Sequence, residues 1–351
     1  MKKYKIAIYT ICKNEESNVE KWAASNSEAD VRIVCDTGSS DTTVEKLRAA
    51  GIETYQITVD PWRFDVARNA SLNLLPADVD ICIWQDLDEV LLPGWREAIE
   101  NNWQEGATNA NHRYRHNNGS WQWHYKIHAR KDCRWRWPVH EKLAWSVPAH
   151  DIWIADFYLD EHQVYKESRN SSYAGLIRKK IEEGERHWKT YMFLAVEYDR
   201  NGDPEQARTE REIAYNVCDD GAIIKSYVAR IIGTTYADIG DYEKADMWFT
   251  RGVMDSPERE TLYRWGHSFY VRKDWANAFV QLSRCIQQQA RRDGYTYDPA
   301  AWSYLPYDEL ALCCYYLEMF NKAVEYGTQA LEIDPNDVRL QSNLAFYKER
   351  V

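Results

Sequence analysis

A short pattern repeats in the C-terminal half of the 351-residue sequence, and this repetition constrains the fold more than any other feature. The segment DPEQA at residues 203–207 recurs as DYEKA at 241–245 and as DWANA at 274–278, with a looser copy at 320–323. Recurrence of this kind predicts stacked copies of one supersecondary unit. We expect about four helix pairs, with a longer insertion at residues 291–304.

Particular residues in the middle copy resemble the tetratricopeptide pattern. They are Gly233, Tyr236, Ala245, Phe249, Gly252 and Pro257, and the last copy closes with Ala330 and Pro335. Small residues at these points let paired helices approach closely, and proline ends the second helix. The resemblance implies an all-α tetratricopeptide-like helical repeat domain over residues 181–351. Such an array binds a protein or peptide partner, packs on a neighbouring domain, or joins two subunits into a homodimer.

The first 90 residues alternate between apolar, β-prone runs and helical segments. The strands are expected at residues 5–11, 31–35, 53–59 and 80–84, and the helices at 15–24, 42–50 and 65–75. This alternation predicts an α/β domain with a mainly parallel sheet and right-handed crossovers. Polar side chains follow these strands, so they are expected along one edge of the sheet.

The fourth run leads directly into Asp86-Leu87-Asp88. In an extended segment, residues two apart point to the same side, so both carboxylates can converge on one cation. The carboxyl ends of strands are where open α/β sheets bind ligands, and oxygen ligands suit Mg²⁺ or Mn²⁺. The pattern predicts a metal–diphosphate site. The structural alternative is an acidic turn after a strand.

Five motifs occur in order: TICKNEE at residues 10–16, DTGSSDTT at 36–43, ARN at 67–69, DLDE at 86–89 and VHE at 139–141. Together they resemble family 2 glycosyltransferases, most closely the branch related to lipopolysaccharide-core transferases. The resemblance implies a GT-A catalytic domain, which is a Rossmann-like α/β fold with a mainly parallel sheet, over residues 1–160. A linker at 161–180 then leads to the repeats.

The resemblance also implies roles for individual residues. The donor site would comprise Thr10, Asn14, Glu15, Asp36, Ser39, Arg68, Asn69 and Asp86. The metal, Mn²⁺ or Mg²⁺, would be held by Asp86 and Asp88, with His140 as a further ligand. Asp88 and Glu141 would be catalytic, Glu141 as the general base on the acceptor hydroxyl. The implied reaction is metal-dependent, inverting transfer of a hexose or pentose from a nucleotide-sugar, most often a UDP-sugar.

Residues 112–145 differ in composition from the rest of the chain. They contain eight lysines and arginines but only two acidic residues, with five histidines and five tryptophans. Trp121 and Trp123 alternate along an expected strand, so both indoles face one side. With Arg136 and Trp137 they are candidates for binding the acceptor, either a saccharide, a protein or a modified nucleic acid. The structural alternative is a hairpin, turning at residues 117–119, that packs its aromatics on the sheet.

Composition narrows the class of protein. The formal net charge of −11 argues against a surface that grips nucleic acid everywhere, though a local basic cleft fits. No run is long enough for a membrane span, and the eight cysteines contain no CxxC pair. We expect a cytoplasmic enzyme with buried, reduced thiols. The alternatives are a non-catalytic tetratricopeptide adaptor with a relic transferase domain, or a glycosyltransferase acting on modified nucleic acid.

Overall fold

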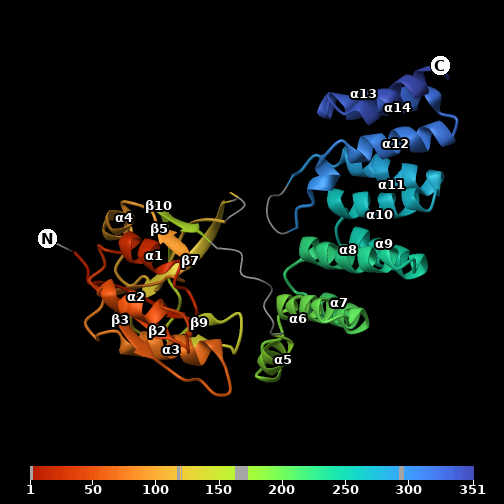
Figure 1. Cartoon of the computed structure of the whole chain (residues 1–351). Coiled ribbons are helices and arrows are strands. Elements are labelled where there is room, and N and C mark those ends of the chain that lie inside the picture. The colour runs from red at the N-terminus through yellow and green to blue at the C-terminus, as the bar shows by residue number, and fades with distance from the viewer. Residues whose placement is uncertain (1–2, 117–118, 120, 163–172, 292–295) are drawn as a thin grey trace. The chain divides into compact units, whose positions relative to one another are not determined.

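The computed structural model describes residues 3–116, 119, 121–162, 173–291 and 296–351. The chain forms two compact units, Met1–Gly184 and Glu185–Val351. Figure 1 shows a sheet with flanking helices in the first unit and stacked helices in the second. Part of the predicted linker and most of the predicted turn at 117–119 lie outside the described residues.

The first unit is a sheet with helices on its faces. Its strands are β1 (Ile6–Cys12), β2 (Val31–Asp36), β3 (Glu53–Gln56), β4 (Ile81–Trp84), β5 (Glu89–Leu91), β6 (Asn109–Arg115), β7 (Trp121–Ala129), β8 (Cys133–Arg136), β9 (Lys142–Trp145) and β10 (Asp151–Glu161). Its helices are α1 (Val19–Ser25), α2 (Thr43–Ala49), α3 (Phe64–Leu74), α4 (Trp95–Asn102) and α5 (Ala174–Glu182). Eight strands form one sheet in the order β3-β2-β1-β4-β7-β6-β10-β5, and β8 pairs only with β9.

Strand β1 lies at the centre of the hydrophobic core. Ile6 and Ile8 pack on one side of the sheet with Trp22 of α1 and Trp95 of α4. Tyr9, on the other side, packs in a cluster that contains Leu72 of α3 and Trp135 of β8. A strand covered on both faces must be apolar on both, which explains why the run IAIYTIC has no polar alternation.

The prediction of a mainly parallel, Rossmann-like GT-A sheet is wrong. Strands β3, β2, β1 and β4 do run parallel. The other half is mixed, because β7 is antiparallel to both β4 and β6, and β5 is antiparallel to β10. Strands β6 and β7 follow one another without a helix, and so short a connection permits only an antiparallel pair.

The second unit consists of helices. They are α6 (Trp188–Arg200), α7 (Pro204–Val217), α8 (Ala222–Asp238), α9 (Tyr242–Asp255), α10 (Arg259–Val271), α11 (Trp275–Gln287), α12 (Leu305–Tyr316), α13 (Phe320–Ile333) and α14 (Val338–Lys348), with a short 3₁₀ helix η1 (Pro299–Trp302). Consecutive helices pack as the pairs α6/α7, α8/α9, α10/α11 and α12/α13, and α14 packs on α13. The predicted helical repeats are confirmed.

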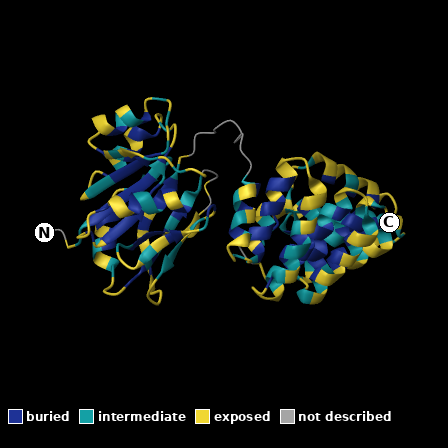
Figure 2. Cartoon of the chain, turned by 90° about the horizontal axis from the view of Figure 1, so that it is seen from below, coloured by how far each residue is buried: buried dark blue, intermediate teal, exposed yellow. Residues whose placement is uncertain are grey.

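The repeated residues explain how each pair forms. Asp203, Asp241 and Asp274 cap the second helix of three pairs, each accepting a backbone N–H from the residue three positions later. A Cβ on Gly233 would lie 2.9 Å from the Phe249 ring, and one on Gly266 would lie 2.7 Å from Leu282. Glycine at these positions therefore permits the close approach of each helix pair. Figure 2 shows buried residues in the interior of the stack and exposed residues along its outer surfaces.

The predicted insertion lies between α11 and α12, and residues 292–295 of it are outside the described residues. Its described part bonds to earlier helices. Arg230 of α8 donates to the Thr296 carbonyl at 2.8 Å, and Arg259 of α10 donates to the Ala301 carbonyl at 2.7 Å. The insertion thus ties itself to two preceding helix pairs.

Candidate functional site

A cavity of about 770 Å³ lies at the carboxyl ends of β1 and β4 in the first unit. Side chains from six strands of the main sheet, from α3 and from the loop at 139–141 line it. They include Lys13, Glu15, Arg68, Trp84, Asp86, Asp88, Glu89, Tyr114, His116, His124, Lys126, His140, Glu141 and Glu161. The DLDE motif spans the turn after β4 and the first residue of β5, so it places three carboxylates in the cavity wall.

Asp86 is neutralised by two cations. Its Oδ1 lies 3.2 Å from Arg68 Nη2, and its Oδ2 lies 3.4 Å from Lys126 Nζ. The Thr10 hydroxyl also donates to Asp86 Oδ1 at 3.4 Å. Burial alone would raise the pKa of Asp86, but Arg68 and Lys126 lower this pKa to about 2. Asp86 is therefore an ionised anchor that holds two cations at the cavity.

Asp88 has the opposite electrostatic environment. Burial, together with the charges of Asp86 and Glu15, raises the pKa of Asp88 to about 6. No lysine or arginine in the described part of the chain forms an ion pair with Asp88. A carboxylate that is repelled by its neighbours gains most from an added positive charge. The two aspartates of the motif thus differ in what they can bind.

Arg68 joins Asp86 to Glu141. Arg68 Nε donates to Glu141 Oε1 at 2.5 Å, and the guanidinium lies 4.8 Å from the centroid of the Trp84 ring. Burial would lower the pKa of Arg68, but Asp86 and Glu141 hold this pKa above its usual value. Glu141 is therefore held in an ion pair with Arg68 and does not stand alone at the cavity.

Lys126 and Glu89 form a buried ion pair that sequence reasoning missed. Tyr114 donates to Glu89 Oε1 at 3.0 Å, and the Asp86 N–H donates to Glu89 Oε2 at 3.0 Å. Burial raises the pKa of Glu89 to about 7, although Lys126 opposes this shift. Lys126 lies in a strand that reads as a hairpin arm, so no local motif marks it.

His116 and Glu161 form a second group that the sequence did not indicate. His116 Nδ1 lies 3.3 Å from Glu161 Oε2. The Tyr114 ring packs against His116 and stacks on His124 at 4.4 Å between ring centroids. Burial and the charges of Lys126 and His116 lower the pKa of His124 to about 4. This group lies on β6, β7 and β10, which the sequence did not place beside β4.

Several residues that were predicted to bind the nucleotide instead form hydrogen bonds within their own loops. The carboxylate of Asp36, which is fully buried, accepts the backbone N–H groups of Gly38 and Ser39 at 3.1 to 3.2 Å. Ser39 Oγ accepts the Asn14 N–H at 2.8 Å, and Asn14 has a left-handed backbone. These side chains build the loop behind the cavity wall, where Lys13, Glu15 and Thr37 face the cavity.

Asn69 and His140, two further predicted site residues, both form hydrogen bonds within the first unit. The Asn69 amide donates to the Trp135 carbonyl and accepts the Trp135 N–H, both at 2.9 Å, so it fastens α3 to β8. The His140 carbonyl accepts a hydrogen bond from Lys180 Nζ, and His140 lines the cavity. Its predicted role as a metal ligand stays a prediction.

The predicted acceptor residues lie on two different sheets. Trp121 and Trp123 are on β7 of the main sheet, with 43% and 40% of their surface exposed. Arg136 ends β8 of the small sheet, and its guanidinium lies 4.7 Å from the Trp137 ring. The two pairs therefore come from different sheets, and their shared role in acceptor binding stays a prediction.

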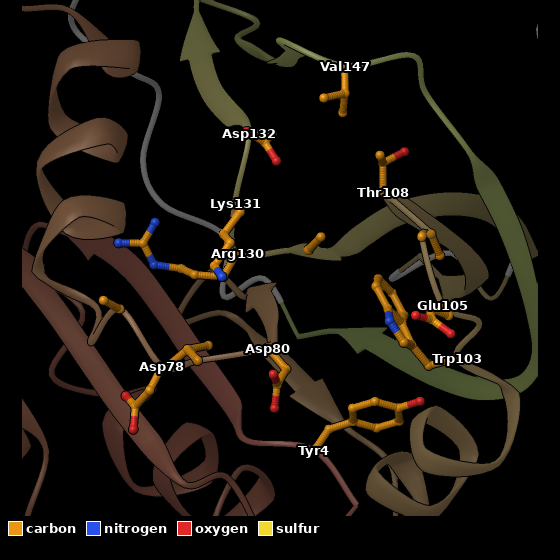
Figure 3. Close-up of a pocket in the computed structure, with 15 residues that line it drawn as sticks. Tyr4, Asp78, Asp80, Trp103, Glu105, Thr108, Arg130, Lys131, Asp132 and Val147 are labelled. Atoms are coloured by element: carbon orange, nitrogen blue, oxygen red, sulfur yellow. The ribbon is translucent and has the colours of Figure 1, made fainter.

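A second hollow, of about 590 Å³, lies at the opposite edge of the main sheet. Figure 3 shows Asp78 and Asp80 on one side of it and Trp103 and Glu105 on the other. Lys5 pairs with Asp78 at 2.7 Å, and the Lys5 N–H donates to Asp80 at 2.8 Å. These acids secure the start of β1, so we assign the candidate site to the other cavity.

A divalent cation fits this candidate site only in part. Among the described residues, no group of three or more His, Cys, Asp or Glu side chains is arranged to hold a metal. Asp86 already has two cations, but Asp88 has none within the described ion pairs. Mg²⁺ and Mn²⁺ are often bound by one or two carboxylates with substrate phosphates completing the shell. Asp88 fits that arrangement.

The second unit is an array of helix pairs, and one stretch of it matches a known repeat family. Residues 306–337 match the tetratricopeptide repeat family model. No curated protein matches this sequence. Within the part of the chain that the structure describes, no helix has the length and apolar character needed to cross a bilayer.

Several solved structures are similar to parts of this chain. A MamA protein is 19% identical, covering 46% of this chain and 81% of its own, with a TM-score of 0.38. MamA from Desulfovibrio magneticus is 21% identical, covering 48% and 86%, with a TM-score of 0.38. The C-terminal part of a TPR repeat-containing protein from Cytophaga hutchinsonii is 16% identical, covering 50% and 64%, with a TM-score of 0.39.

Proposed function

We propose that the first unit transfers a sugar from a nucleoside-diphosphate sugar, most simply a UDP-sugar, to an acceptor hydroxyl with inversion. The observation that supports this most is the juxtaposition of Arg68 and Lys126 with Asp88 in one cavity. Arg68 and Lys126, although ion-paired with carboxylates, present N–H donors to a diphosphate, and a divalent cation held by Asp88 would offset those carboxylates. The five ordered sequence motifs support the same class of donor.

The chain's own residues have distinct parts in this proposal. Arg68 and Lys126 orient the diphosphate, and Asp86 holds both cations in place. Asp88 would hold Mg²⁺ or Mn²⁺, which neutralises the charge developing on the leaving diphosphate. His116, oriented by Glu161, accepts the proton of the acceptor hydroxyl, because Glu141 is engaged by Arg68. His116 therefore replaces Glu141 as the proposed base.

Calorimetric titration with UDP, GDP, CDP and dTDP, with and without Mn²⁺, tests the donor site. We expect one nucleotide to bind the wild-type protein only with metal, and Asp88→Asn to lose that binding. The matched control is Asp78→Asn at the opposite sheet edge, which should bind as the wild type does. Binding that is unchanged in Asp88→Asn would remove the central assignment.

A second function is supported by the repeat match at residues 306–337. In this reading the second unit binds a protein partner or a second copy of the chain, and the first unit is a catalytically inactive relic. Absence of binding by every nucleotide, with a folded protein, would favour this adaptor function over transfer.

A further inference from the structure

One face of the antiparallel half of the main sheet presents exposed aromatic side chains. On β10, Trp153 is 60% exposed and Tyr158 is 40% exposed, and on β7 Trp121 and Trp123 are exposed to a similar degree. Trp123 packs edge-on to Trp153 at 4.8 Å, and Trp121 packs edge-on to Tyr158 at 5.6 Å, between ring centroids. These four rings therefore form one continuous surface.

Two arginines of β6 lie within this surface. Arg113 is the register partner of Trp123, and Arg115 that of Trp121, so each pair shares a face of the sheet. The Arg113 guanidinium lies 4.3 Å from the Trp123 ring centroid, and that of Arg115 lies 5.4 Å from the Trp121 centroid. We call Arg113, Arg115, Trp121, Trp123, Trp153 and Tyr158 the aromatic–arginine face.

The two sides of these strands differ sharply. On the other side, Ala110, Tyr114 and Ile127 are buried in the main core cluster that also contains Trp95 of α4. The aromatic–arginine face stays open to solvent, although large contiguous aromatic surfaces are rare on proteins that bind nothing. Packing within the first unit does not explain why these aromatic side chains are exposed.

Charge decides between the ligands that such a face can accept. Arg115 is paired with Asp160, whereas Arg113 forms no ion pair with any described residue. A second copy of the same face would place arginine against arginine, which disfavours self-association. A neutral saccharide would leave the Arg113 guanidinium without a counter-charge.

We infer that the aromatic–arginine face binds single-stranded nucleic acid. Unpaired bases stack on exposed aromatic rings, and phosphates pair with arginine, so one ligand satisfies both kinds of side chain. Trp121 and Trp123 provide two stacking positions about 7 Å apart along one strand. The overall charge of −11 confines this binding to a local basic surface. The inference goes beyond the proposed sugar transfer and does not depend on it.

Fluorescence anisotropy of labelled oligo(dT) and oligo(U) of about 15 nucleotides, at about 50 mM salt, tests the inference with the full chain. We expect both single strands to bind more tightly than a duplex of equal length. Trp123→Ala and Arg113→Gln should each weaken binding by about fivefold or more. Tyr55→Ala, which removes an exposed aromatic on β3, should leave affinity unchanged.

Absence of oligonucleotide binding, or equal affinity in Trp123→Ala, Arg113→Gln and the wild type, would overturn the inference. Tighter binding of heparin or of anionic vesicles than of oligonucleotides would also overturn it. Circular dichroism checks that both variants are folded. Nucleoside-diphosphate titration of Trp123→Ala separates the two proposals, since the cavity should bind its nucleotide regardless of this face.

Discussion

The two units treat their charged side chains differently. In the helical unit, the ionic groups pair off: Arg264 with Asp298 at 2.6 Å, Arg339 with Asp308 at 2.6 Å and Arg272 with Asp246 at 2.9 Å. In the cavity of the first unit, Arg68 and Lys126 contact Asp86, while the neighbouring Asp88 keeps a raised pKa. Paired charges in one unit serve the fold, whereas the imbalance in the other marks a site for a ligand.

The largest effect is expected from Arg68→Met in the first unit. This change leaves Asp86 and Glu141 without their buried partner, and should lower the free energy of unfolding by about 3 kcal/mol or more. Arg339→Met in the helical unit is the matched control, because half of the Arg339 side chain is exposed and its pair should contribute at most about 1 kcal/mol. Urea denaturation followed by circular dichroism measures both. Equal losses of unfolding free energy in the two variants would contradict the proposed difference between the units.

Gly266→Ala should have the next largest effect. It should lower the free energy of unfolding of the helical unit by about 1–3 kcal/mol. The added Cβ would lie 2.7 Å from Leu282, so α10 and α11 must move apart. Gly175→Ala in α5 is the control, because a Cβ there meets nothing within 4 Å. That variant should be neutral or slightly more stable. Thermal unfolding of both proteins tests whether the close helix approach is needed.

Nucleotide binding with Mn²⁺ should weaken about tenfold between pH 7 and pH 5. Asp88, with its pKa raised to about 6, is mostly ionised at the higher pH and mostly protonated at the lower. The same raised pKa means that folding takes up a proton between about pH 4 and 6. This carboxyl group therefore makes the first unit less stable as the pH rises through that window. Calorimetry across pH would contradict the assignment if affinity were flat.

Asp241→Ala should have the smallest effect, a loss of about 1 kcal/mol in the helical unit. The Asp241 carboxylate accepts the Lys244 N–H at the start of α9, and alanine leaves that donor without its cap. Asp241→Asn should keep most of the stability, since asparagine also caps helices. Chemical denaturation of the two variants would show no difference if the carboxylate acted only through its charge.

Sequence reasoning predicted local structure better than the pairing of distant strands. The recurring Asp and Ala positions mark the helix pairs, because capping and close packing depend on residues near in sequence. The order of β7, β6 and β10 in the sheet depends on long-range pairing, which local periodicity does not encode. Lys126, His116 and Glu161 were missed for this reason, since each enters the cavity from that half of the sheet.

For some predicted site residues the residue type indicated a place at the cavity, and for others it did not. Asp86 and Asp88 line the cavity, and the sequence singled them out because their motif comes shortly after a buried strand. Asp36 has the residue type of a ligand contact, but in the structure it accepts hydrogen bonds from its own loop. Aspartate commonly stabilises turns in this way, so residue type alone does not separate the two roles.

The insertion between α11 and α12 has a consequence for how the helical unit unfolds. In a simple repeat array each pair contacts only its neighbours, so the ends can fray while the middle persists. Here Arg230 of α8 and Arg259 of α10 both donate to carbonyl groups of the insertion, which precedes α12. These bonds join two successive helix pairs to the insertion before a third pair, so loss of one pair disturbs the others. We therefore expect the unit to unfold more nearly as a single cooperative block than as a series of independent repeats.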